Sequence, residues 1–190
     1  FGSNVNLIYR SDLPLRGFDN EIRGCLEKEL LNKGIKIYPK TKIKKVSKNS
    51  KLDIELDDGR ILSSDELLVA TGRKANTDNL KLENTGVEIS HDRSILVSEN
   101  SRTNIETVFA IGDVTDRINL TPVALGEGHA FADREFGNKK RFFEYDNVPC
   151  AVFSQPPISS VGLTEEEAVN QGINCEHTWP QSMGANEEPQ

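Results

Sequence analysis

The chain has 190 residues, of which 36% are hydrophobic and 28% are charged, and its formal net charge at pH 7 is −7. No apolar run approaches the roughly 20 residues needed to span a membrane, and no basic block of the kind that binds nucleic acid is present. We therefore expect one globular domain or two small ones, without a membrane or nucleic-acid partner. A cytoplasmic location is a separate expectation.

Cysteine and histidine are too scattered to predict a disulfide framework or a metal site. The cysteines form no CxxC or CxxxxC pair, and the histidines lack ligand spacing; these residues are Cys25, Cys150, Cys175, His91, His129 and His177. Cys25 lies on the apolar side of a predicted helix and Cys150 beside an apolar strand, so we expect both to be buried structural thiols.

The first 38 residues predict a strand–helix–strand unit. A strand over 4–9 ends at Arg10, and a loop leads to a helix over about 20–33 whose apolar residues recur at helical spacing. Gly34 stands where a C-terminal cap belongs. A short strand over 35–38 follows.

Three β segments come next, around 41–46, 52–56 and 60–62, with a hairpin turn at Asp57-Asp58-Gly59. The apolar run 67–71 is typical of a buried strand. Together with the preceding unit, these elements match the second half of a dinucleotide-binding domain. The GxGxxG turn of such a domain is absent from these residues.

The stretch 107–128 carries the clearest site signal. A buried strand over 108–111 stops at Gly112-Asp113, and a helix opens at Thr121, its expected N-cap, and runs to about residue 136. Ligands of α/β proteins bind at that edge of the sheet, and a helix N-terminus favours negative charge. Asp113 is thus a candidate ligand of a sugar hydroxyl. The alternative is an ordinary strand–loop–helix with Asp113 in a turn.

The remaining elements are shorter. A strand is predicted over 95–97, residues 138–147 read as a linker, and two strands are predicted over 148–153 and 158–163. Thr164 and Glu167 form a capping box that opens a helix ending near Gly172.

Five short motifs then occur in order. They are Ala70-Thr71-Gly72-Arg73, Ala110-Ile111-Gly112-Asp113, Leu120-Thr121-Pro122-Val123-Ala124, the run from Val152 to Ile158, and Val161-Gly162-Leu163-Thr164-Glu165. The set resembles the flavin-dependent pyridine nucleotide–disulfide oxidoreductases over about residues 3–172. Within that family it is most similar to the glutathione reductases of plants or cyanobacteria.

This resemblance implies an α/β fold made of parts of three domains. Residues 1–75 would be the C-terminal part of a Rossmann-like NADPH-binding domain with its β-meander. Residues 76–145 would be the return segment of the FAD-binding domain, and 146–190 the start of an α+β dimerisation domain. The tail 173–190 does not resemble that domain, and we expect it to be poorly ordered.

Two arginines bear on cofactor specificity. The end of the second strand of a dinucleotide fold faces the adenosine ribose, where an acidic residue suits NAD and arginine suits the 2′-phosphate of NADP. Here that strand ends in Arg10, and Arg16 follows six residues later, the spacing of the NADP-binding pair in glutathione reductases. The alternative is that both arginines are solvated loop residues.

Other roles follow from the resemblance alone. Asp113 would bind the ribityl chain of FAD, and Thr121 would lie beside the flavin ring. Gly72 would let NADPH approach the backbone, and Asn119 and Ala151 would lie on the nicotinamide side.

The implied activity is NADPH- and FAD-dependent reduction of glutathione disulfide by a homodimer. The family's redox CxxxxC pair and its His-Pro-Thr histidine are absent here, so the chain holds no catalytic residue. We expect it to be an internal fragment that is inactive alone. The alternatives are another flavin disulfide reductase, of mercuric or lipoamide type, and a non-catalytic nucleotide-binding module.

Overall fold

A computed structural model describes residues 2–173 as a mixed α/β protein with small sheets. The described residues divide into two compact units. One unit is residues 68–148, and the other is formed by the residues before and after them.

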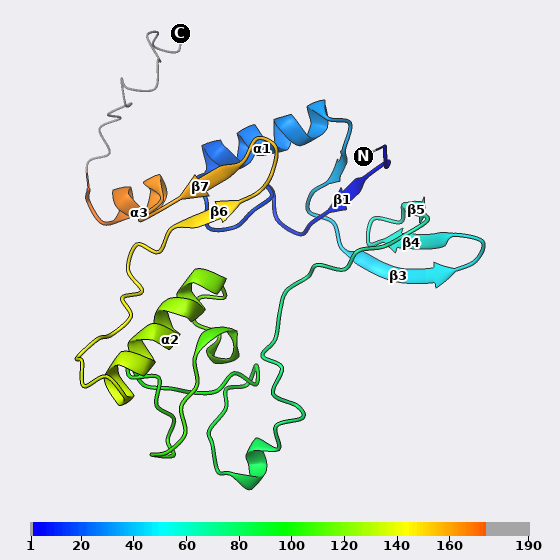
Figure 1. Ribbon diagram of the computed structural model, residues 1–190. Coiled ribbons are helices and arrows are strands. Elements are labelled where there is room, and N and C mark those ends of the chain that lie inside the picture. Colours follow the sequence, from blue (N-terminus) through cyan, green and yellow to red (C-terminus); the bar gives the residue numbers. More distant parts are fainter. Residues whose placement is uncertain (1, 174–190) are drawn as a thin grey trace. The chain divides into compact units, whose positions relative to one another are not determined.

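The N-terminal segment forms the expected β–α–β unit (Figure 1). Strand β1 (Asn6–Ile8) pairs in parallel with β2 (Lys36–Tyr38), and helix α1 (Asn20–Asn32) connects them. Gly34 ends the helix at φ +82°, the left-handed conformation that glycine adopts without strain. Its N–H donates to the carbonyl of Leu31 at 2.8 Å, which confirms the predicted cap.

Cys25 is an exception on this helix: it is exposed, so the expectation of a buried thiol is wrong. Consecutive helical residues are about 100° apart around the axis, and Leu26 is the residue that α1 buries, at 4% exposure. Cys25 is thereby turned toward solvent. Cys150 is half-buried rather than buried.

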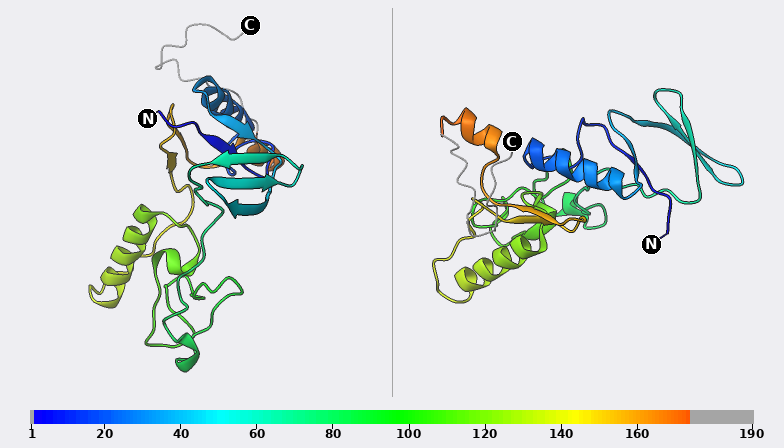
Figure 2. Two further views of the ribbon diagram at one scale, coloured as in Figure 1. Left: turned by 90° about the vertical axis from the view of Figure 1, so that its right-hand side faces the viewer. Right: turned by 90° about the horizontal axis from the view of Figure 1, so that it is seen from above.

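The predicted meander is an antiparallel sheet of β3 (Ile43–Lys48), β4 (Leu52–Leu56) and β5 (Ile61–Ser64), seen from a second side in Figure 2. Gly59 in the β4–β5 turn has φ +88°, and its N–H donates to the carbonyl of Leu56 at 3.1 Å. The hairpin is therefore confirmed. Leu56 is fully buried.

The apolar run 67–71 forms no strand, contrary to the prediction. Leu68 and Val69 are 89% and 66% exposed. A strand of a buried parallel sheet needs hydrogen-bonded neighbours and covering layers, and no described residue pairs with this segment.

The unit 68–148 has a core of Val87, Ile95 and Ala110, with half-buried apolar side chains packed around it. The strands expected over 95–97 and 108–111 are reduced to isolated bridges, Ile89 with Ile95 and Arg102 with Phe109. This unit also contains two short 3₁₀ turns, η1 (Leu82–Asn84) and η2 (Gly112–Thr115). Among the described residues, these segments have no neighbouring strand to extend the bridges into a sheet.

Helix α2 spans Thr121–Glu135. Its cap residue is Leu120 rather than Thr121, and no side chain caps it, so the expected threonine cap is wrong. Thr121 and Pro122 are already helical, because proline is suited to the first turn, where its missing N–H has no helical partner. A Cβ at Gly137, just after the helix, would lie 2.7 Å from the carbonyl oxygen of Asp133, so glycine is required there.

The C-terminal described segment is an antiparallel pair, β6 (Cys150–Val152) and β7 (Ile158–Ser160), followed by α3 (Glu165–Asn170). The capping box is confirmed: the Glu167 N–H donates to Thr164 Oγ1 at 3.3 Å, and the Thr164 N–H donates to Glu167 Oε2 at 2.8 Å. The poorly ordered tail that we expected, with Cys175 and His177, lies outside the described residues except for Ile173.

Within residues 2–173, no helix is long and apolar enough to cross a membrane. The same residues hold no cluster of three or more histidine, cysteine, aspartate or glutamate side chains suited to a metal ion.

Leu56→Ala is expected to lower the free energy of unfolding by about 2–5 kcal/mol, because it leaves a cavity at a fully buried position. Ile61→Ala, at a position that is 67% exposed, is the matched control and should change it by less than about 0.5 kcal/mol. Urea unfolding followed by circular dichroism measures both. Equal losses would contradict the assigned burial.

Candidate functional site

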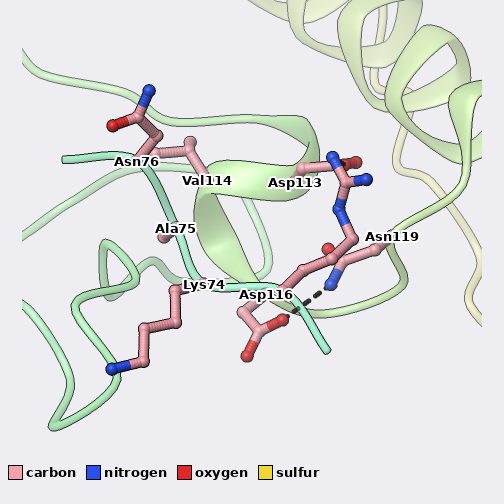
Figure 3. A pocket seen from close by; sticks show the side chains of 8 residues that line it. Lys74, Ala75, Asn76, Asp113, Val114, Asp116 and Asn119 are labelled. Carbon is pink, nitrogen blue, oxygen red and sulfur yellow. Dashed lines mark hydrogen bonds and ion pairs between the residues drawn. The ribbon is translucent and has the colours of Figure 1, made fainter. Parts of the chain in front are cut away.

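Asp113 lies in the 3₁₀ turn η2 and lines a surface depression of about 200 Å³ (Figure 3). All the lining residues belong to the unit 68–148: Arg73, Lys74, Ala75, Asn76, Asp113, Val114, Asp116 and Asn119. Six of these eight residues have polar or charged side chains. Such side chains can bind the hydroxyl groups of a ligand.

Two polar contacts join residues that line the depression. Arg73 Nη2 lies 3.7 Å from Asp113 Oδ2; the Arg73 side chain is largely exposed and the Asp113 side chain is half-exposed. Asn119 Nδ2 donates to Asp116 Oδ1 at 2.7 Å, the dashed line of Figure 3. The Asp113 carboxylate thus keeps acceptor capacity toward solvent, as a ligand of a sugar hydroxyl requires.

The turn before Asp113 needs glycine. Gly112 has φ +72°, and a Cβ there would lie 3.1 Å from the Cβ of Ala124 on α2. A side chain would meet both backbone strain and this close approach. Helix α2 and the turn are therefore packed directly on each other.

A buried carboxylate holds the turn in place. Glu127 on α2 is 2% exposed, and its two oxygens accept the Gly112 N–H and the Tyr145 hydroxyl, each at 2.5 Å. Arg117 Nη2 lies 3.5 Å from Glu127 Oε1, and its guanidinium stacks over the Tyr145 ring at 4.7 Å. Burial and the adjacent Glu127 carboxylate raise the pKa of the Tyr145 hydroxyl above its ordinary value.

Glu127 is not among the residues predicted from the sequence, because a glutamate in a helix is ordinarily solvated. Its position on the buried face of α2 was the signal that could have indicated its burial. Val123, Glu127 and Ala130 are spaced by four and three residues, which places them on one helix face, and all three are buried.

The other residues predicted to bind the flavin or the nicotinamide are exposed. Thr121 is the first residue of α2, and Gly72, with φ +129°, precedes Arg73. Asn119 lines the same depression as Asp113, although the two were predicted for different cofactors. Ala151 lies in β6 opposite Ser159, in the other unit.

Arg10 and Arg16 lie on the loop between β1 and α1, and both are exposed. The structure thus places the two guanidinium groups on one loop, after a parallel strand and before a helix. Neither arginine forms an ion pair or a hydrogen bond with the residues that the structure describes.

Helix α1 holds this loop. Arg23 donates from Nε to the carbonyl of Pro14 at 2.7 Å and from Nη2 to that of Leu13 at 2.8 Å. The Tyr9 hydroxyl donates to Glu27 Oε1 at 2.5 Å. Burial and this carboxylate raise the pKa of Tyr9. Arg23 and Glu27 were not predicted, and their one-turn spacing on α1 was the available signal.

Residues 1–128 match the family described as pyridine nucleotide-disulphide oxidoreductase, and residues 148–185 match the dimerisation domain of the same family. A glutathione reductase of Nostoc sp. is 46% identical over 180 residues, covering 88% of this chain and 39% of that protein. A trypanothione reductase of Trypanosoma congolense is 43% identical over 169 residues, covering 88% and 34%.

A solved structure agrees with these matches. The HOCl-induced flavoprotein disulfide reductase RclA from Escherichia coli has a TM-score of 0.87 and 28% identity, covering 98% of this chain and 45% of that one. The chain thus spans between about one third and two fifths of the length of the curated relatives above.

Replacing Tyr145 tests the buried network through pH. A raised pKa in the folded state stabilises the fold fully below the ordinary tyrosine value near 10, and this stabilisation is lost as the pH rises above it. Between pH 9 and 11, Tyr145→Phe should therefore lose less unfolding free energy than the wild type, by up to about 1 kcal/mol after allowance for solvent screening.

Urea unfolding at the two pH values measures this difference. Tyr38→Phe is the control, because the Tyr38 hydroxyl makes only a 3.4 Å contact with Asn6. The unfolding free energy of Tyr38→Phe should fall between pH 9 and 11 as much as that of the wild type. A Tyr145→Phe profile parallel to the wild type would contradict the assigned network.

Proposed function

The chain belongs to the pyridine nucleotide-disulphide oxidoreductase family, and we propose that it forms part of an NADPH- and FAD-dependent reductase of glutathione disulfide. The observation that carries the proposal is the pair of unpartnered arginines, Arg10 and Arg16, on the β1–α1 loop. The similarity to a named glutathione reductase supports the choice of substrate.

The state of these arginines is unusual within the chain. Of the ten arginines, the other eight each make an ion pair, a hydrogen bond or a ring contact, whereas Arg10 and Arg16 have no such partner among the described residues. The chain carries seven more acidic than basic residues, so partners are plentiful. Two free guanidinium groups suit the 2′-phosphate of NADP, which takes charge-assisted and bidentate contacts.

The depression at Asp113 fits the FAD side of the proposal. Its carboxylate would accept hydrogen bonds from ribityl hydroxyls, and the first turn of α2 at Thr121 would present its positive dipole end to the flavin ring. FAD, when bound, would supply the redox chemistry between NADPH and a disulfide. Glu127 would hold the turn that aims Asp113. Gly72, Asn119 and Ala151 remain proposed contacts of NADPH.

The domain assignment is also a proposal. We assign residues 1–75 to the NADPH domain, 76–145 to the FAD domain and 146–190 to the dimerisation domain, and we propose a cytoplasmic homodimer. The match of residues 148–185 to a dimerisation domain supports the last segment. Cell fractionation and size-exclusion chromatography of the protein expressed from the complete gene test the location and the dimer.

A second substrate follows from one relative. The trypanothione reductase of Trypanosoma congolense is nearly as similar as the glutathione reductase, so trypanothione disulfide is the competing substrate within the family. Lipoamide-type and mercuric reductases are the more distant alternatives. Turnover of each disulfide and of Hg²⁺ by the protein from the complete gene, with NADPH and with NADH, separates these candidates.

Arg10 and Arg16 are expected to set the choice between NADPH and NADH. In the protein from the complete gene, Arg10→Gln with Arg16→Gln should raise the KM for NADPH by about 10- to 100-fold, since each lost charged contact is worth about 1.5 kcal/mol or more. The KM for NADH should change little. Steady-state kinetics with both nucleotides measure this split.

Arg60→Gln is the matched control, because Arg60 is exposed and paired with Asp58 on the β4–β5 hairpin. It should leave both KM values near the wild type. Equal losses for NADPH and NADH in the double variant would refute the phosphate contact.

The isolated chain is expected to be inactive. It has no CxxxxC pair, and Cys25, Cys150 and Cys175 lie far apart in sequence, so it should show no NADPH-dependent reduction of glutathione disulfide. The protein from the complete gene should be active in the same spectrophotometric assay. Turnover by the isolated chain above a no-protein blank would disprove this expectation.

A further inference from the structure

Helix α1 turns two oppositely charged side chains, one helical turn apart, toward the loop that carries Arg10 and Arg16. Arg23 and Glu27 each bind a different part of this loop. Both contacts lie inside one unit of the structure.

All three guanidinium nitrogens of Arg23 donate hydrogen bonds, two of them to the loop and one to Asn20 at the start of α1. Nε and Nη2 donate to the carbonyls of Pro14 and Leu13, and Nη1 donates to Asn20 Oδ1 at 2.8 Å. The two carbonyls belong to the residues between Arg10 and Arg16. Arg23 therefore fixes the backbone that separates the two phosphate-binding candidates and is not itself one of them.

Glu27 fixes the start of the same loop. The Tyr9 hydroxyl donates to Glu27 at 2.5 Å, and Tyr9 is the residue before Arg10. The backbone adds a further contact: the Thr41 N–H donates to the Tyr9 carbonyl at 3.1 Å. The position of Arg10 is thus set from β1, from α1 and from Thr41 in the segment between β2 and β3.

The loop also holds a backbone conformation that needs such support. Leu15 has φ +52° and Gly17 has φ +85°. A leucine in the left-handed region costs about 1 kcal/mol or more and persists where surrounding contacts fix it. Arg23 binds the carbonyls of Leu13 and Pro14, the two residues that directly precede Leu15.

We propose that Arg23 and Glu27 are positioning residues that set the spacing between Arg10 and Arg16, and thereby the preference of the protein for a 2′-phosphorylated adenosine. This inference rests on the proposed NADP site. It adds that the selectivity depends on the geometry of the loop as well as on the charges of the two exposed arginines.

The test is isothermal titration of the protein from the complete gene with 2′,5′-ADP and with 5′-AMP. Arg23→Met should raise the Kd for 2′,5′-ADP by about tenfold, the loss expected when a charged contact is displaced, and leave the Kd for 5′-AMP unchanged. Arg23→Lys should recover part of the affinity, because an ammonium still reaches a carbonyl. Tyr9→Phe, which removes one hydroxyl, should give a smaller rise for 2′,5′-ADP alone.

Lys28→Gln is the matched control, since it removes the same charge from the same helix at an exposed position. It should leave both Kd values within about twofold of the wild type, because solvent screens an exposed charge. An effect of Lys28→Gln equal to that of Arg23→Met would show that net charge, not loop geometry, sets the preference, and would overturn the inference.

Two further outcomes separate the inference from the proposed function. If the wild type prefers 2′,5′-ADP and Arg23→Met keeps that preference, the NADP site stands and the positioning role fails. If the wild type binds both nucleotides equally, the NADP assignment fails and the inference with it. A loss of 5′-AMP affinity in Arg23→Met equal to the loss of 2′,5′-ADP affinity would show a general structural role and would also refute the inference.

Discussion

The hydrogen bond from the Gly112 N–H to the buried carboxylate of Glu127 is the constraint on which the unit 68–148 depends. An unpaired carboxylate at 2% exposure would cost several kcal/mol. Here the charge is compensated by a backbone N–H, the Tyr145 hydroxyl and the Arg117 guanidinium. These partners come from the turn, from the segment after α2 and from the segment before it. One side chain therefore ties three parts of the chain together where regular strands are absent.

The same principle shapes the other unit. In the β1–α1 loop, backbone carbonyls accept from a guanidinium, and in the Gly112 turn a backbone N–H donates to a carboxylate. In both places a long charged side chain on a helix binds the main chain of the preceding loop or turn. The residues proposed to meet ligand, Arg10, Arg16 and Asp113, are left exposed beside these contacts. Support and recognition are thus divided between buried or half-buried helix residues and exposed loop residues.

Much of the local structure could be predicted from the sequence, because its determinants are local. The Thr164–Glu167 capping box, the hairpin at Gly59 and the cap at Gly34 each depend on a few neighbouring residues, and the last two also on glycine at positive φ. The predicted strands at 67–71, 95–97 and 108–111 failed because a strand is defined by its partner. These segments are hydrophobic, but among the described residues no neighbouring strand pairs with them.

The supporting residues of the site could not be predicted for a different reason. Motif matching selects residues at loops and strand ends, such as Asp113 and Arg10, because these resemble ligand-binding patterns. Glu127 and Arg23 look like ordinary helix residues, and their roles arise only when the helix is docked on the loop it binds. Such a contact holds a loop or turn only while its geometry is kept, because hydrogen bonds are directional. Replacing Glu127 or Arg23, even by a chemically similar residue, should therefore displace the turn or loop that it binds, and with it the exposed residues proposed to meet ligand.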